Sequence, residues 1–192
     1  TVYTTTGAAK DPGEPNHAGN TGGASAWTTF TPTEEGTAKL STENSDFDTV
    51  LAIYKVGTGS GWDALEEVGS DDNGGEDGED SEVVFNVEVG VTYLVAVDGA
   101  GGETGTVQLN HELSKTPVID SVTESADGLL NGTVTLEVSA SSPLADAELT
   151  YQWRRDGNLI DGASGATLTL ENMQYTDAGD YTVEVSSFAG EV

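Results

Sequence analysis

The sequence contains no cysteine and few basic residues. Without cysteine it has no disulfide framework and no thiolate metal site. Lys and Arg account for 6 of its 192 residues and Asp and Glu for 34, so the formal net charge is −28. Nucleic acids and anionic membranes are both bound through basic surfaces. The composition therefore argues against these two partners and favours a hydrated, cation-attracting surface.

Long hydrophobic runs and long helical patterns are also absent, and the only weak helical window is Asp63–Val68, where a turn is the alternative. The longest apolar runs, "TVLAIY" and "YLVAV", have the length of a strand and fall far short of the roughly 20 residues of a membrane span. Short alternating runs recur between clusters of Gly, Asn, Asp and Ser, a pattern that predicts an all-β protein. The expected strands are Val2–Thr6, Ser25–Thr31, Gly36–Thr42, Thr49–Val56, Glu82–Val87, Thr92–Asp98, Gly105–Asn110, Val118–Thr123, Gly132–Ala140, Leu149–Arg155, Ala166–Leu170 and Gly179–Ser186.

A domain boundary is predicted in "HELSKTPVID", His111 to Asp120. The segment follows a completed strand, and its Pro117 suits the first residue of a new edge strand. We expect two tandem β-sandwich domains, residues 1–113 and 114–192. Because Thr1 stands where an initiator Met would, we also expect a processed piece of a longer protein.

The second domain carries "LTYQWRRDGNLI" and "DAGDYTVEV", and with them it resembles an immunoglobulin-like domain of the I-set type. The resemblance places Trp153 at the buried tryptophan of strand C and Tyr181 at the tyrosine corner. It also places Val138 and Val183 where the family has its two half-cystines. It therefore implies that these four residues form a core that depends on packing alone.

The end of this domain predicts an assembly role. Strand F is expected to run to Ser186 and "SSFAGEV" to form the F–G turn, so we expect the last strand to be missing. An open strand F would present free backbone groups to a strand from a neighbouring copy or domain. Such head-to-tail addition propagates as a filament. The alternatives are that "TVYTTT" belongs to the first domain's own sheet and that the parent protein continues past Val192.

The first domain carries "AWTTFTPTEEGTAKLSTENSDFDTVLAIYKVG" and "FNVEVGVTYLVAVDG", and it resembles the bacterial pre-peptidase C-terminal (PPC) domain, a jelly-roll-like β-sandwich. Relatives of that domain include the collagen-binding domains of clostridial collagenases, which bind calcium through E-x-E-x-N-D. In "PGEPNH", Glu14 and Asn16 match this pattern, whereas Pro12 and His17 do not. The resemblance thus implies half of a calcium motif.

The densest acidic segment is "GSDDNGGEDGEDSE", Gly69 to Glu82, with seven carboxylates and four glycines in fourteen residues. Calcium takes six to eight oxygen ligands, and a glycine-rich loop can turn several of them inward. The spacing is not that of an EF-hand. The candidate ligands are Asp71, Asp72, Asn73, Asp77 and Asp80, together with Asp46 and Asp48 in "SDFDT". The alternatives are a solvated loop and, for Asp48, a hydrogen bond to its own turn.

The sequence argues against an enzyme. It has no G-x-S-x-G, H-E-x-x-H or phosphate-binding glycine loop. Its only histidines, His17 in a Pro/Gly loop and His111 at the domain boundary, are expected at the surface.

We therefore expect a non-catalytic structural or adhesive segment of a secreted or cell-surface bacterial protein, serving as stalk, spacer or filament subunit and stabilised by calcium. Its expected partners are neighbouring domains, copies of itself, or an extracellular polysaccharide or protein matrix. The alternative is a substrate-targeting module of an exoenzyme that binds polysaccharide or collagen. In that case Trp62, in the glycine-rich "GSGWDAL", would stack on a sugar. The competing expectation is that Trp62 caps one end of the sandwich.

Overall fold

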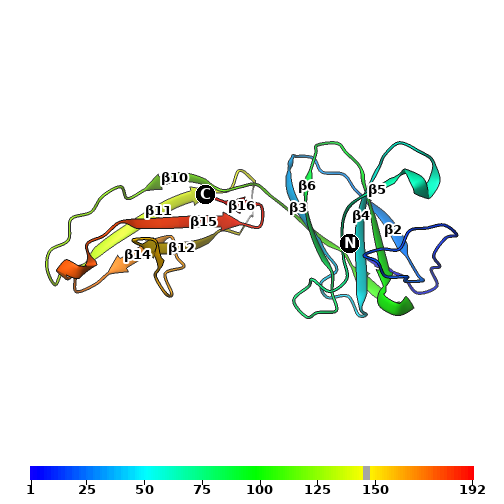
Figure 1. Cartoon of the computed structure of the whole chain (residues 1–192), viewed down its shortest axis with the longest axis horizontal. Helices are drawn as coiled ribbons and strands as arrows, with labels where there is room; N and C mark the ends of the chain where they lie inside the picture. Colours follow the sequence, from blue (N-terminus) through cyan, green and yellow to red (C-terminus); the bar gives the residue numbers. More distant parts are fainter. Residues whose placement is uncertain (145–147) are drawn as a thin grey trace. The chain divides into compact units, whose positions relative to one another are not determined.

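The computed structural model describes residues 1–144 and 148–192, and it divides into two compact units, Thr1–Leu113 and Ser114–Val192. Among the described residues all regular structure is β-strand apart from three short 3₁₀ turns (Figure 1). No helix in this part of the chain is long and apolar enough to cross a membrane. The protein is thus all-β, as the alternating pattern predicts.

The first unit is a sandwich of two antiparallel sheets. One sheet has the order β2-β7-β4-β5 and the other β6-β3-β9, and a separate pair joins β1 to β8. The strands are β1 (Val2–Thr4), β2 (Ala26–Phe30), β3 (Gly36–Ser41), β4 (Thr49–Val56), β5 (Leu65–Asp71), β6 (Glu82–Val87), β7 (Tyr93–Gly99), β8 (Thr106–Gln108) and β9 (Asn110–Ser114).

The core of this unit lies between the sheets and explains the apolar run in β4. Leu51 and Ile53 face the main core, which also takes Leu40 from β3 and Val95 from β7. The intervening residue Ala52 and its neighbour Tyr54 pack in a smaller cluster on the other face of the same sheet. Because β4 is buried on both faces, its sequence is a continuous apolar run and does not alternate between apolar and polar residues.

The second unit is also a two-sheet sandwich, with the orders β10-β11-β14 and β13-β12-β15-β16. The strands are β10 (Val118–Val122), β11 (Val134–Ser141), β12 (Thr150–Arg155), β13 (Asn158–Leu159), β14 (Thr167–Leu170), β15 (Tyr181–Ser187) and β16 (Gly190–Glu191). Val134, Leu136 and Val138 alternate along β11, so they all face the opposite sheet.

The end of the second unit differs from the expectation of a missing last strand. The chain turns at Phe188–Ala189, and β16 pairs with Ser186 and Ser187 of β15. Val192 continues this ladder by exchanging both backbone hydrogen bonds with Val185, at 2.9 and 3.0 Å. A strand therefore begins beside β15 within the segment that we expected to be only a turn.

Candidate functional site

The carboxylates of the acidic loop, Gly69 to Glu82, serve mainly to fold the loop itself. Asp71 Oδ2 accepts hydrogen bonds from the amides of Gly74 at 2.6 Å and Glu82 at 2.9 Å. Asp77 Oδ1 accepts two amides of the following turn at 2.9 Å each. These backbone hydrogen bonds lower the pKa of Asp77. Asp71 and Asp77 therefore close turns rather than present open oxygen ligands.

Two further candidates also have backbone partners. Asp46 Oδ1 accepts the amide of Thr106 at 2.6 Å. Asp80 is 3% exposed, and its Oδ2 accepts the amide of Asn44 at 3.0 Å. Burial raises the pKa of Asp80. Asn73 is exposed at the surface of the loop.

The pair formed by Asp48 and Asp72 differs from these carboxylates. The Oδ1 atom of each is buried, and neither has a hydrogen-bond partner. Burial raises the pKa of Asp48, and the negative charges of Asp72, Glu103 and Glu79 raise it further. A buried carboxylate oxygen that lacks a donor is costly unless a cation or proton compensates it.

The position of this pair follows from the register of the sheet. Asp48 directly precedes β4 and Asp72 directly follows β5, and the two strands pair with Leu51 opposite Asp71. The start of one antiparallel strand lies beside the end of its neighbour, so residues distant in sequence meet at one edge. Glu103 approaches from the turn after β7, where its Oε2 lies 3.4 Å from the amide of Asp48.

Asp48, Asp72 and Glu103 mark an acidic edge of the first unit, but they do not surround a cation with carboxylates. Within residues 1–144 and 148–192, no group of three or more Asp, Glu, His or Cys side chains is placed to hold a metal ion. Calcium usually takes six to eight oxygen ligands. Asp48 and Asp72 therefore fit a cation only if backbone carbonyls and water supply most of its ligands.

Glu14 and Asn16, the half-motif, are also engaged in the fold. Glu14 Oε1 accepts a hydrogen bond from Trp27 Nε1 at 2.8 Å and lies 3.2 Å from His17 Nε2. Asn16 Oδ1 accepts a hydrogen bond from Lys10 Nζ at 3.0 Å. Burial opposes the ionisation of Glu14, but the hydrogen bonds it receives outweigh this effect and lower its pKa. Both side chains hold the segment between β1 and β2 in place.

His17 is buried, so the expectation that it lies at the surface is wrong. It is 1% exposed, and its Nδ1 lies 2.8 Å from the hydroxyl of Tyr54. Burial lowers the pKa of His17, although Glu14 opposes the shift. The segment between β1 and β2, which carries His17, is also held by Asp98. The side chain of Asp98 is fully buried, and its Oδ1 accepts a hydrogen bond from the amide of Ala24 at 2.8 Å. His111, by contrast, is exposed.

Sequence reasoning missed the cluster of His17 and Tyr54 because the two residues lie 37 positions apart. The available signal was Tyr54 itself. A tyrosine on the outer face of a central strand needs a cover, and the long segment before β2 can provide one.

Trp62 lies in a 3₁₀ turn, Gly61–Ala64, and is half-buried. Its ring packs against Trp27 with centroids 5.4 Å apart, and Trp27 in turn lies 5.6 Å from Tyr54. Trp62 thus extends the aromatic cluster outward over the sheet. Trp62 therefore packs on the outer face of a sheet, and sugar binding by Trp62 stays a prediction.

The core residues expected in the second unit lie together. Trp153 is 2% exposed and shares a cluster with Val138, Val183 and Tyr181. Trp153 Nε1 donates to the carbonyl of Gly165 at 2.9 Å. The Tyr181 hydroxyl donates to the carbonyl of Asp177 at 2.8 Å, which is the geometry of a tyrosine corner.

Comparisons with known proteins identify β-sandwich neighbours. No protein-family model and no curated protein match the sequence. The crystal structure of the N-terminal four Ig domains of Dscam1 isoform 6.9 matches with a TM-score of 0.32 and 18% identity, covering 75% of this chain and 35% of that chain. The fibronectin(III)-like modules of Clostridium thermocellum CbhA match with a TM-score of 0.35 and 14% identity, covering 100% of this chain and 88% of that one. This chain therefore spans about a third of the Dscam1 chain, and the solved structures similar to it are Ig-like and fibronectin III-like sandwiches.

Proposed function

We propose that this chain is a non-catalytic structural or adhesive segment of a secreted or cell-surface bacterial protein, acting as a stalk, spacer or filament subunit. The proposal is supported by the positions of the ionisable side chains, which stabilise the fold. His17 and Glu14, which have the chemistry of a general acid and base, are buried as anchors of a surface segment. Most acidic candidates accept hydrogen bonds from backbone amides of the fold. The first unit would then be a PPC-like module and the second an immunoglobulin-like module.

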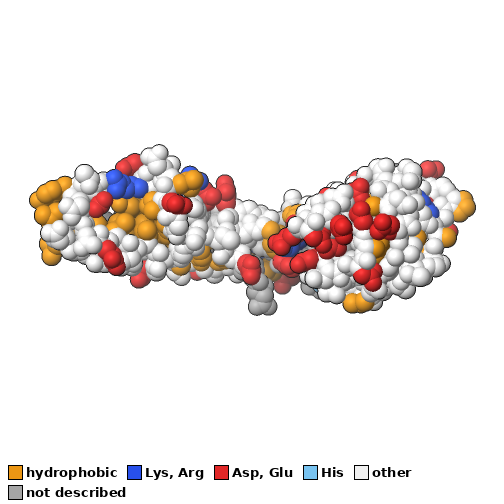
Figure 2. Space-filling model, turned by 90° about the horizontal axis from the view of Figure 1, so that it is seen from below, with side chains coloured by type: hydrophobic (Ala, Val, Ile, Leu, Met, Phe, Trp, Pro, Cys, Tyr) orange, Lys and Arg blue, Asp and Glu red, His pale blue; other side chains and the backbone are white. Residues whose placement is uncertain are grey.

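We further propose that Asp48 and Asp72 bind calcium weakly at the acidic edge of the first unit. The support is the pair of buried Oδ1 atoms without donors, in a region where burial and, after it, like charges raise the pKa of Asp48. A bound cation would compensate both oxygens. Figure 2 shows acidic side chains gathered on one face of this unit, which would raise the local cation concentration.

Thermal unfolding with calcium or with EDTA tests the metal proposal. An ion that binds only the folded form adds ~2.7 kcal/mol of stability at a hundredfold excess over its Kd, so the first unit should melt several degrees higher in calcium. Asp72→Asn should abolish this gain. Glu76→Gln is the matched control, because it removes one exposed charge from the same loop. Equal melting of the wild type in calcium and EDTA would refute the site.

Sedimentation of the purified chain, with and without calcium, tests the structural role. A filament subunit should associate as its concentration rises, whereas a spacer between neighbouring domains should remain monomeric. Turnover of peptide or polysaccharide substrates that is lost in Glu14→Gln, with the fold retained, would contradict a non-catalytic role.

A further inference from the structure

The sequence contains two Asn-Gly pairs, Asn73–Gly74 in the acidic loop of the first unit and Asn131–Gly132 in the second unit. In such a pair the amide nitrogen of glycine can attack the side-chain carbonyl carbon of asparagine, because glycine has no Cβ to obstruct the approach. The attack closes a five-membered succinimide ring, and water opens this ring to aspartate or isoaspartate. Whether an Asn-Gly pair reacts therefore depends on how the fold holds its two residues.

The fold leaves the side chain of Asn73 free to react. Asn73 and Gly74 are both exposed, in the loop between the end of β5 and the start of β6. Among the described residues, no hydrogen bond holds the Asn73 side chain. Its carboxamide can therefore turn toward the backbone nitrogen of Gly74.

Asp71 places a carboxylate on the reacting nitrogen. Its Oδ2 accepts the hydrogen bond of the Gly74 amide at 2.6 Å, which is short for a bond of this type. A Cβ added to Gly74 would come within 2.7 Å of the same oxygen, so glycine fits closely beside Asp71. An N–H bond lies in the plane of its peptide group, and this hydrogen bond leaves the face of the nitrogen open to Asn73. Asp71 therefore meets the geometric condition for a general base.

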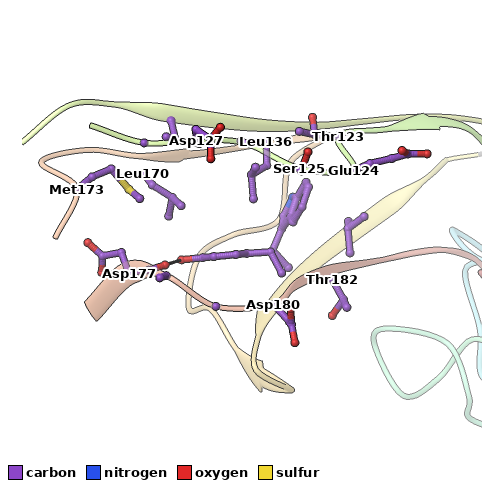
Figure 3. Close-up of a pocket in the computed structure, with 18 of the residues that line it drawn as sticks. Thr123, Glu124, Ser125, Asp127, Leu136, Leu170, Met173, Asp177, Asp180 and Thr182 are labelled. Atoms are coloured by element: carbon purple, nitrogen blue, oxygen red, sulfur yellow. Dashed lines mark hydrogen bonds between the residues drawn. The ribbon is translucent and has the colours of Figure 1, made fainter. Parts of the chain in front are cut away.

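The second pair is held in place by its neighbours. Asn131 Oδ1 accepts a hydrogen bond from Gln174 Nε2 at 3.2 Å. Met173, whose side chain is labelled in Figure 3, accepts the amide of Asn131 at 2.9 Å and donates its own amide to the carbonyl of Gly132 at 3.0 Å. The amide of Gly132 donates to the carbonyl of Leu129 at 2.8 Å, and a carbonyl oxygen is a much weaker base than a carboxylate. This pair thus provides a comparison within the same chain.

We propose that Asn73 is a self-modifying residue, which Gly74 attacks with Asp71 as the general base and which becomes aspartate or isoaspartate. A bond forms between Gly74 N and Asn73 Cγ, and the bond between Cγ and Nδ2 breaks. The proton of the Gly74 amide passes to Asp71 and from there to the leaving nitrogen, which departs as ammonia. Water then adds across one carbonyl–nitrogen bond of the ring and leaves a carboxylate. The inference goes beyond the proposed structural role and does not depend on it.

The modification changes the loop that joins β5 to β6. Gly74 N carries no hydrogen in the succinimide, so of its two amide donors Asp71 keeps only that of Glu82, at 2.9 Å. Isoaspartate lengthens the backbone by one methylene and adds a negative charge to a segment that already has seven carboxylates. The aged chain should therefore hold this loop less tightly than the newly made chain.

The test incubates the whole chain at neutral pH in EDTA and follows both asparagines by peptide mass spectrometry, with isoaspartate detected by its enzymatic methylation. We expect Asn73 to convert, with isoaspartate as a product, while most of Asn131 stays intact. Asn73→Gln should give no product, because glutamine would have to close a six-membered ring. Asp71→Asn keeps an acceptor for the Gly74 amide but cannot take its proton, and it should slow the conversion about tenfold or more.

Incubation in urea separates the action of a base from the looseness of the loop. Unfolding removes Asp71 from its position, so wild type and Asp71→Asn should convert Asn73 at similar rates in urea. Glu76→Gln, an exposed change in the same loop, is the matched control and should convert at the wild-type rate in both conditions.

Three results would overturn the proposal. Equal conversion of Asn73 and Asn131 in the folded chain would show that the Asn-Gly sequence alone decides the rate. A wild-type or faster rate in folded Asp71→Asn would show that Asp71 does not act as the base. Conversion to aspartate without isoaspartate would show direct hydrolysis of the side chain and exclude the ring. None of these results depends on calcium or on assembly, so the tests of the proposed function are unaffected by them.

Discussion

Burial lowers the pKa of His17, because the folded chain cannot solvate the imidazolium as water does. The groups that face it are Glu14, Tyr54, Lys10 and, at longer range, Asp98. Tyr54 shares the same environment, and burial raises the pKa of its hydroxyl. His17 is therefore held neutral while the carboxylate of Glu14 stays ionised.

The first prediction is a loss of stability on acidification. The unfolded His17 takes up a proton near pH 6.5 and the folded one resists it, so stability is complete above pH 6.5 and decreases as the pH falls toward the lower folded pKa. One such group contributes a slope of at most about 1.4 kcal/mol per pH unit. Because the pKa of Glu14 is also lowered, a second loss should begin below about pH 4.5.

Urea unfolding of the first unit between pH 8 and pH 4 measures these slopes. His17→Gln should lower stability at pH 8 but flatten the slope between pH 6.5 and pH 5. His111→Gln is the control, because that side chain is exposed. The same slope in wild type and His17→Gln would show that another group causes the pH dependence.

Trp153 provides the second prediction, because the second unit has no disulfide and depends on packing. Truncation of a large buried aromatic residue costs ~3–5 kcal/mol, a large part of a small domain's stability. Trp153→Ala should therefore unfold this unit, and Trp153→Phe should weaken it less. Hydrogen exchange should show lost protection in β12 and β15, with β4 of the first unit still protected. Tyr175→Ala, at a side chain that is 88% exposed, should leave both units intact.

At the scale of the element, the sequence predicts most strands but not how they share two sheets. The runs that become β4 and β7 are recognisable because they are apolar and bounded by turn residues. The expected strand Gly105–Asn110 is instead divided into β8, which pairs with β1, and β9, which pairs with β3. Val107 in β8 and Leu109, the residue between β8 and β9, face the same core, so the alternating pattern continues into the break.

The acidic loop shows the same limit for the candidate site. The composition of the loop and of "SDFDT" indicates carboxylates that could bind a cation, and Asp72 and Asp48 are among these candidates. Composition cannot reveal which oxygens are already occupied, because the donors to Asp71 and Asp46 include amides 11 and 60 residues away. Only the folded chain separates the turn-closing carboxylates from the pair that is left without donors.

Asp71 yields the third prediction, since it joins the end of β5 to the start of β6. Asp71→Ala removes the acceptor of two amides, one of them partly buried, and should cost ~1–3 kcal/mol. Asp71→Asn retains an acceptor oxygen and should cost less. Glu76→Ala, an exposed change in the same loop, should stay within about 0.5 kcal/mol. Urea unfolding in EDTA measures all three, and equal stabilities for the alanine variants would show that the loop is held by other contacts.

At the scale of the whole molecule, the main feature is the imbalance of 34 acidic to 6 basic residues. Both units contain more acidic than basic residues. Ion pairs such as Lys55–Glu88 and Arg154–Glu184 neutralise only a few carboxylates and lie at exposed positions, where they contribute little. The remaining negative charges repel one another more strongly in the compact fold than in the unfolded chain.

The fourth prediction follows from this repulsion: added salt should stabilise both units. The Debye length shortens from ~10 Å at 0.1 M to ~3 Å at 1 M salt, so most repulsion between surface carboxylates is screened over that range. Melting temperatures should therefore rise between 0.05 and 0.5 M sodium chloride in EDTA. Tetramethylammonium chloride should give the same rise if screening is the cause, whereas an effect confined to sodium would indicate bound ions. A melting temperature that does not change with either salt would mean that the acidic residues are spaced widely enough for water alone to screen them.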